Sequence, residues 1–173
     1  MKTKFKLIAL VTLICATLSL AVSCSEPPAN TTYEKDGLSF YLPTLMREIK
    51  SDYYDICYAT VVYSFGAIKL TPDFLASEGL AEDTGAKEYT DYYFEINGIS
   101  RDECEIVYRE KQNAYAFSYS VSSDGVNYDY NYCVILEGEG CLWYTVFTCA
   151  YDDAATYLGS FEMYSKHIEV IGE

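Results

Sequence analysis

The sequence predicts an α+β fold with a central antiparallel sheet of about six strands that is covered on both faces. Residues 104–110, 115–121, 128–137 and 141–150 form four closely spaced apolar segments, and glycine-containing turns follow the second and the third of them, which is typical of an antiparallel meander. The last two segments are apolar on both sides of a strand, so each face of the sheet needs a covering layer. The 173 residues suffice for one such domain and not for several.

Two strands are predicted ahead of the meander. Residues 37–43 place apolar side chains at alternate positions and end at Pro43, as a strand does. Residues 56–65 are rich in Val, Ile, Tyr and Thr and contain no charged residue, which favours a second, better buried strand.

Two helices are predicted between these strands and the meander. Thr71 as N-cap and Pro72 at the first position begin a short helix that Gly79 limits. Residues 86–97 carry tyrosines at helical spacing, and Gly98 provides the C-terminal stop of this longer helix.

A third helix is predicted over residues 153–166, after the meander, with Asp152 as its N-cap. A short extended segment at 168–171 follows it. His167, the only histidine, then stands at the end of this helix, where its charge complements the C-terminal dipole. We therefore expect a structural role for His167 and not a catalytic one.

The register of the last hairpin follows from the centre of its turn, which we place at Glu139. Cys133 is then opposite Thr145, and Tyr132 is opposite Val146. One face would hold Cys133, Ile135, Trp143 and Phe147, and the other Tyr130, Tyr132, Val134, Leu136, Leu142, Tyr144 and Val146.

Residues 1–23 are typical of a bacterial lipoprotein signal peptide. Three lysines precede an uncharged apolar stretch from Leu7 to Val22, which is shorter than the roughly 20 apolar residues of a transmembrane helix. The segment Leu20-Ala21-Val22-Ser23-Cys24 resembles a lipobox, so Cys24 is expected to become the N-terminus and to carry acyl chains such as palmitate.

This processing predicts a protein that is lipid-anchored at a bacterial cell membrane or outer membrane and faces away from the cytoplasm. Residues 24–32, with two prolines and small polar residues, would form the tether of a single domain at 33–173. Two alternatives stay open: ordinary cleavage after Ser23 would give a freely secreted protein, and an uncleaved stretch would be a short membrane anchor.

The composition excludes a nucleic-acid partner. Twelve basic and 26 acidic residues give a net charge of −14, which offers no basic surface for phosphates and repels the domain from anionic lipid headgroups. Five cysteines remain after the signal peptide and the lipidation site, and none has the spacing of a zinc site. We expect small buried thiols, with one disulfide possible, at Cys57, Cys104, Cys133, Cys141 and Cys149.

Three features together resemble the PsbP-like superfamily, which includes photosystem II accessory proteins and small bacterial lipoproteins. They are residues 37–43 (GLSFYLP), the order of strands and helices, and residues 161–170 (FEMYSKHIEV), and the resemblance extends over about 33–171. It implies a three-layer α/β/α sandwich and an assembly or binding accessory role, with no shared catalytic residues and no cofactor.

Tyrosine is the unusual residue of this chain, with 19 tyrosines against one tryptophan. A stiff apolar ring with a hydroxyl suits both sheet packing and a recognition surface. The adjacent pairs Tyr53-Tyr54 and Tyr92-Tyr93 cannot both face one side of an element, so one ring of each pair is a candidate contact for an envelope protein or a glycan.

The leading functional hypothesis is a lipid-anchored extracytoplasmic binding or assembly accessory protein without catalytic activity. The sequence contains no nucleophile elbow, no HExxH and no phosphate-binding glycine loop. The alternatives are a carboxylate-dependent enzyme acting on glycans and a purely structural envelope protein. Oxygen-bearing side chains at Asp124, Asn127, Asp129 and Asn131 are a weaker calcium hypothesis, because they lack EF-hand spacing.

Overall fold

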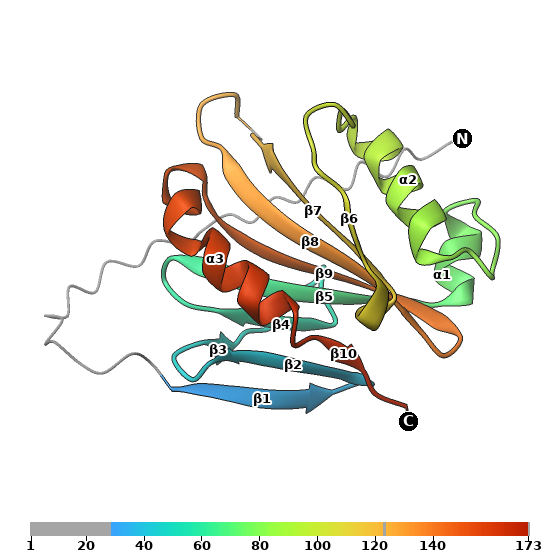
Figure 1. Cartoon of the computed structure of the whole chain (residues 1–173), viewed down its shortest axis with the longest axis horizontal. Helices are drawn as coiled ribbons and strands as arrows, with labels where there is room; N and C mark the ends of the chain where they lie inside the picture. Colours follow the sequence, from blue (N-terminus) through green and yellow to red (C-terminus); the bar gives the residue numbers. More distant parts are fainter. Residues whose placement is uncertain (1–28, 123, 173) are drawn as a thin grey trace, which may run out of the picture.

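The computed structural model describes residues 29–122 and 124–172, so the predicted signal peptide, Cys24 and most of the predicted tether lie outside the described residues. The described chain forms a seven-stranded and a three-stranded sheet, both antiparallel, with three α-helices (Figure 1). The large sheet has the order β3-β4-β5-β9-β8-β7-β6 and the small one β1-β2-β10. The strands are β1 Asn30–Lys35, β2 Leu38–Pro43, β3 Arg47–Glu48, β4 Ile56–Ala59, β5 Tyr63–Leu70, β6 Val107–Arg109, β7 Ala114–Val121, β8 Asp129–Gly138, β9 Cys141–Ala150 and β10 Glu169–Val170. The helices are α1 Pro72–Ser77, α2 Ala86–Asn97 and α3 Ala154–Ser165.

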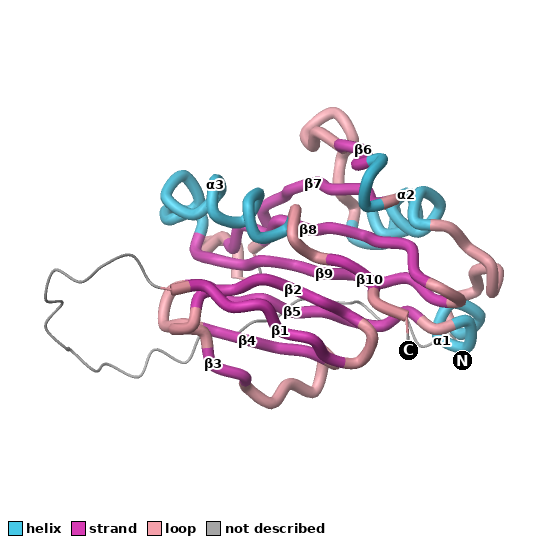
Figure 2. The backbone as a smooth tube through the Cα atoms, turned by 60° about the horizontal axis from the view of Figure 1, so that its bottom comes forward, coloured by secondary structure: helices cyan, strands magenta, loops and turns pink. Residues whose placement is uncertain are grey.

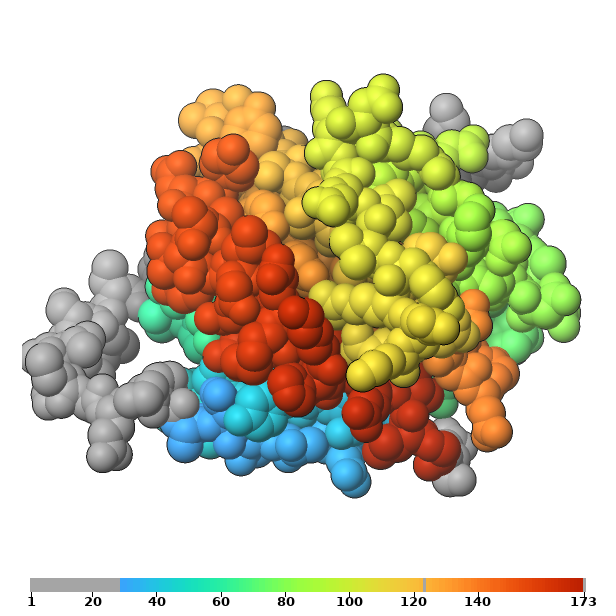
Figure 3. All heavy atoms as spheres, viewed as in Figure 1, coloured from blue at the N-terminus to red at the C-terminus, as the bar shows by residue number. Residues whose placement is uncertain are grey.

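Both faces of the large sheet are covered, as predicted, but the two covering layers differ. On one face α1 and α2 pack against the sheet, for example through Phe94 on Phe117 with ring centroids 4.9 Å apart. On the other face lie α3 and the small sheet together (Figure 2), where Phe161 of α3 stacks on Phe147 at 5.2 Å. The space-filling view shows α3 directly against the small sheet (Figure 3).

The α+β class and the antiparallel sheet are therefore confirmed, and two details of the expected sandwich are corrected. The central sheet has seven strands instead of about six. The layer that contains α3 is half β, because β2 belongs to the small sheet and contributes Leu38, Phe40 and Leu42 to the core between the sheets.

The small sheet begins with β1, whose first three residues fall within the predicted tether. Strand β1 starts at Asn30 and pairs with β2 along its whole length. Asp36 and Gly37, with φ of 53° and 90°, form the two-residue turn between them, which suits the twist of a hairpin. The predicted extended segment at 168–171 contains β10, which pairs with the other edge of β2.

The predicted strand at 56–65 is in fact a hairpin. The chain turns after Ala59, where the Thr60 hydroxyl accepts hydrogen bonds from the backbone N–H groups of Val62 and Tyr63 at 3.2 and 3.1 Å. Strand β5 then runs back beside β4 and continues to Leu70, where it also pairs with β9. The single predicted strand therefore supplies two neighbouring strands of the sheet.

The register predicted for the last hairpin is wrong by one residue. Glu139 and Gly140 form a two-residue turn, and Cys133 pairs with Val146 instead of Thr145. A shift of one residue moves every side chain of a strand to the opposite face. Trp143 and Phe147 therefore lie with Val134 in the core beneath α3, while Leu142, Tyr144 and Val146 lie with Cys133 and Ile135 beneath α2.

The first two helices begin and end where the sequence predicts. The Thr71 hydroxyl accepts a hydrogen bond from the N–H of Phe74 at 3.3 Å, as an N-cap does. Gly98 ends α2 in the left-handed conformation with φ of 65°, which glycine adopts without strain. The predicted cap of α3 is wrong: Asp152 lies within a 3₁₀ turn, Tyr151–Asp153, that leads into the helix.

Candidate functional site

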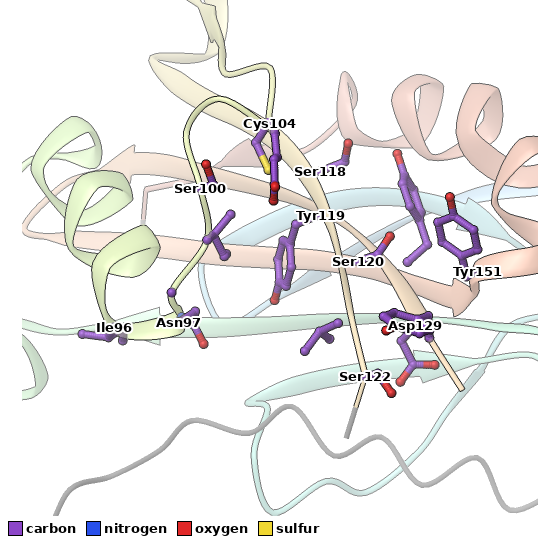
Figure 4. Close-up of a pocket in the computed structure, with 16 residues that line it drawn as sticks. Ile96, Asn97, Ser100, Cys104, Ser118, Tyr119, Ser120, Ser122, Asp129 and Tyr151 are labelled. Atoms are coloured by element: carbon purple, nitrogen blue, oxygen red, sulfur yellow. The ribbon is translucent and has the colours of Figure 1, made fainter. Parts of the chain in front are cut away.

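A groove runs along the outer edge of β7. Its volume is about 900 Å³, and it lies between the end of α2 with the loop that follows and the strands β7 and β8 (Figure 4). We call it the β7 groove. Its lining consists of Ile96, Asn97, Gly98, Ile99, Ser100, Glu103, Cys104, Ser118, Tyr119, Ser120, Val121, Ser122, Tyr128, Asp129, Tyr130 and Tyr151.

The groove exists because β6 is much shorter than predicted. The sequence predicts a strand over 104–110, whereas β6 covers only Val107–Arg109 and pairs with Ala114, Tyr115 and Ala116 of β7. Beyond Ala116, no strand of the described chain pairs with the outer edge of β7. The loop after α2 stands away from this part of the edge, which leaves the groove between them.

Exposed aromatic rings form the wall on the β8 side. Tyr128 and Tyr151 are 49% and 55% exposed, and their rings meet edge to face with centroids 6.5 Å apart. Figure 4 shows the Tyr151 side chain beside Ser120 and above Asp129 at this end of the groove. Rings held in this way offer a rigid apolar surface with hydroxyls at its rim.

The charge of the groove is negative. Asp129 and Glu103 are the carboxyl groups of its lining, and among the residues that the structure describes no lysine, arginine or histidine belongs to the lining. Burial, together with the nearby charge of Asp124, raises the pKa of Asp129. Arg101, on the same loop as Glu103, pairs with Asp91 of α2.

A tyrosine cluster beneath α2 connects the groove to the core. The Tyr119 ring lines the groove, and its hydroxyl is hydrogen-bonded to that of Tyr93 at 2.6 Å. The Tyr93 hydroxyl also meets the Tyr144 hydroxyl at 2.9 Å, and Tyr144 contacts Cys133 Sγ at 3.4 Å. Burial raises the pKa of Tyr93, Tyr119 and Tyr144 well above the usual value, so all three stay neutral donors.

The four predicted contact tyrosines are not brought together. Tyr53 is 72% exposed and lies outside the β7 groove, and the half-buried Tyr54 packs its ring so closely over Gly66 that an added Cβ there would lie 2.7 Å from it. Tyr92 is half-buried and donates its hydroxyl hydrogen to Glu78 Oε2 at 2.7 Å. Tyr93, only 2% exposed, belongs to the core.

The proposed calcium ligands do not converge either. Asp124 holds its own turn, where its carboxylate accepts hydrogen bonds from the N–H groups of Val126 and Asn127, both at 2.8 Å, and these bonds lower the pKa of Asp124. Asn131 is buried elsewhere and accepts a hydrogen bond from Thr148 at 2.8 Å. No group of three or more possible metal ligands occurs within residues 29–122 and 124–172.

His167 lies at the end of α3, as the sequence predicts. Its Nδ1 lies 2.8 Å from the carbonyl oxygen of Met163 in the last turn of α3, and its ring packs on Tyr41. His167 does not line the β7 groove. Cys57, Cys133 and Cys149 are buried thiols, as predicted, and burial raises the pKa of each. The prediction is wrong for Cys104 and Cys141, which are only half-buried.

The groove itself was not predicted from the sequence. The candidate contact tyrosines of the sequence do not include Tyr128 or Tyr151, and no sequence motif points to the serines of β7. A usable signal is present: β7 runs from alternating alanines into Ser118, Ser120 and Ser122, so that its second half has small polar side chains where a covered strand would have apolar ones.

Within the part of the chain that the structure describes, no helix is long and apolar enough to cross a bilayer. No protein-family model matches the sequence, and no curated protein matches it.

Solved structures with a similar fold do exist. Cyanobacterial PsbP (CyanoP) from Synechocystis matches with a TM-score of 0.55 and 13% identity, covering 87% of this chain and 97% of its own. The Ran-binding protein Mog1p from Saccharomyces cerevisiae matches with a TM-score of 0.54 and 8% identity, covering 84% of this chain and 97% of its own. A Bacteroides thetaiotaomicron protein matches with a TM-score of 0.51 and 10% identity over 84% of this chain and 49% of its own. The chain therefore has a PsbP/Mog1-like fold, in line with the resemblance to the PsbP-like superfamily.

Proposed function

We propose that this chain is a lipid-anchored extracytoplasmic binding or assembly accessory protein that holds its ligand in the β7 groove. The observation that carries the proposal is the groove itself: a hollow of about 900 Å³ with exposed tyrosines on one wall. Sites of this size and composition are typical of ligand binding. The serine hydroxyls and the Cys104 thiol of the lining have no histidine beside them to act as a base.

The lipid anchor rests on Cys24 and the segment before it. Acyl chains on Cys24 would hold the acidic domain at the membrane surface, while its charge keeps it off anionic headgroups. Mass spectrometry of the chain purified from membranes measures this directly, and the expected result is a diacyl or triacyl modification at Cys24. An unmodified thiol there, in protein released into the medium, would contradict the anchor.

The binding role is tested with a photoreactive side chain in the groove. Tyr151 is replaced by p-benzoylphenylalanine in the full chain, and cells are irradiated; the control carries the same group at Val61, which is 83% exposed and lies outside the groove. We expect a discrete adduct from position 151 and none from position 61. Equal labelling at both positions, or none at either, would contradict a ligand site in the groove.

One observation favours a second candidate, a carboxylate-dependent enzyme acting on glycans. The groove contains two acids, and the raised pKa of Asp129 is a property of general acids in such enzymes. Turnover of envelope polysaccharides by the full chain, abolished in Asp129→Asn and retained in Asp83→Asn outside the groove, would establish this candidate over the non-catalytic one.

The exposed tyrosine rings argue against the remaining alternative, a purely structural envelope protein. A protein that only occupies space in the envelope has no need for large aromatic side chains in solvent, yet Tyr53, Tyr128 and Tyr151 are each about half exposed or more. Exposed aromatic residues are enriched at binding surfaces, which supports a binding role.

A further inference from the structure

We infer that the ligand of the β7 groove is an extended polypeptide segment carrying lysine or arginine, which adds to the large sheet as a strand beside β7. This inference rests on the proposed binding function and specifies its ligand. Three independent features of the groove carry it: the hydrogen-bonding groups of the strand edge, the charge of the lining, and the position of the rings.

The first feature is the direction of the backbone groups of β7. In an antiparallel sheet, successive residues turn their N–H and C=O groups to opposite sides of the strand. Asn113, the residue before β7, accepts a hydrogen bond from the N–H of Glu137 at 3.2 Å, so Asn113 faces the β8 side. The backbone N–H and C=O groups of the odd-numbered residues of β7 therefore bond to β8, and those of the even-numbered residues point away from β8, toward the outer edge.

A second bond supports the same assignment from the other side of β8. The carbonyl oxygen of Tyr128 accepts a hydrogen bond from the N–H of Tyr151 at 2.8 Å. The backbone N–H and C=O groups of even-numbered residues of β8 therefore point to β9, and those of odd-numbered residues point to β7. Ala114 and Ala116, the even-numbered residues at the start of β7, lie opposite β6. Ser118 and Ser120 follow in the same phase and present their N–H and C=O groups to the groove.

An extended peptide can form backbone hydrogen bonds along the whole of such an edge, which other classes of ligand cannot. Outward N–H and C=O groups two residues apart match the repeat of another strand, and adding a strand to an exposed sheet edge is an established mode of peptide recognition. The unpaired stretch from Phe117 to Val121 is about as long as an ordinary strand. The groove provides the room that β6 fills beside the first half of β7.

The charge of the lining selects among peptides. Asp129 and Glu103 face the groove without a basic residue in the lining, within a chain whose net charge is −14. A segment with lysine or arginine is attracted to this surface, and its cationic side chains can also pack on the exposed faces of Tyr128 and Tyr151. A second copy of this chain would bring Asp129 and Glu103 of both copies together, which disfavours edge-to-edge pairing of two copies.

The test uses the full chain in detergent micelles and a library of peptides of about six residues, the usual length of a strand, with β-branched and randomised positions in alternation. We expect the bound peptides to be enriched in lysine and arginine at the randomised positions. A matched set of the selected peptides, N-methylated on alternate residues so that one edge loses its N–H groups, is expected to bind at least about tenfold more weakly.

Two substitutions at one position separate the backbone from the side chain. Ser120→Pro removes the outward N–H and leaves the bonds to β8 intact, since proline is tolerated at edge positions that face away from the sheet. Ser120→Ala keeps the N–H and removes only the hydroxyl. We expect Ser120→Pro to weaken peptide binding at least about tenfold and Ser120→Ala to change it less than about twofold, with unchanged circular dichroism.

The outcomes distinguish this inference from the proposed function. Equal binding by Ser120→Pro and Ser120→Ala, no enrichment of basic residues, or no loss on N-methylation would overturn strand addition. If the photoreactive group at position 151 still gives an adduct in those cases, the binding function stands with another ligand. An adduct that is a polysaccharide identifies a glycan, and a dimer of this chain identifies a second copy; either result overturns the peptide. No adduct together with no peptide binding refutes both proposals.

Discussion

Tyr93→Phe tests whether the buried tyrosine hydroxyls beneath α2 form a network that stabilises the fold. The hydroxyl of Tyr93 bonds to those of Tyr119 and Tyr144 at 2.6 and 2.9 Å, and removing it takes away both bonds while the ring remains. Each bond contributes about 0.5–1.5 kcal/mol, so the loss is about 1–3 kcal/mol of unfolding free energy. Tyr144, 4% exposed, would keep its contact with the Cys133 thiol.

The neighbouring Tyr92→Phe is the matched control. Its half-buried hydroxyl donates to Glu78 Oε2 at 2.7 Å, near water that can replace the lost donor, so we expect a loss of no more than about 1 kcal/mol. Urea denaturation followed by circular dichroism measures both variants, with an unchanged m-value as the sign that the unfolded state is unaffected. Equal losses in the two variants would refute the network.

Three further predictions follow from the core and the anchor. Phe147→Ala, which removes a ring packed against Phe65 and stacked on Phe161 at centroid distances of 4.9 and 5.2 Å, should cost about 3–5 kcal/mol in urea denaturation, whereas Val61→Ala on the surface should stay within about 0.5 kcal/mol. Burial raises the pKa of Tyr63 and of Cys133 to about 12, so both groups stay neutral in the folded protein after their unfolded counterparts have ionised. The contribution of these two groups to the unfolding free energy should therefore be constant below about pH 8 and fall as the pH rises toward about 12, and denaturation curves at stepwise higher pH that show no fall would contradict the burial. Cys24→Ser should abolish acylation of the chain, measured as the loss of incorporated labelled palmitate, and label that persists would refute lipidation at Cys24.

The elements that sequence predicts well are those whose ends are set by local chemistry. Gly98 ends α2 because its left-handed conformation is strained for other residues, and Thr71 with Pro72 begins α1 for equally local reasons. Where the end of an element depends on the packing of the rest of the chain, the prediction from sequence is wrong. Asp152 resembles an N-cap, but the chain reaches α3 through a 3₁₀ turn that no local rule distinguishes from a helix start.

The register of the last hairpin illustrates a different limit. Register is normally fixed by the need to bury one apolar face, and a one-residue shift then exposes it. In β8 and β9 both faces are apolar and both are covered, so either register buries the strands equally well. The two-residue turn at Glu139 and Gly140 decides between them, and the alternation of apolar residues carries no information about it.

The β7 groove depends on where β6 stops, and this is a tertiary property. Residues 104–106 have a sequence suited to a strand, yet only Val107–Arg109 pair with β7. A sequence that continued the pairing would have closed the edge, as proteins usually do with exposed strand edges. The serines of β7 mark the place where small polar residues replace the apolar ones of a covered strand. An edge left open beside exposed rings and two carboxylates is a structural cost that a binding role would explain, which is why the outward N–H of Ser120 is the most informative single group to remove.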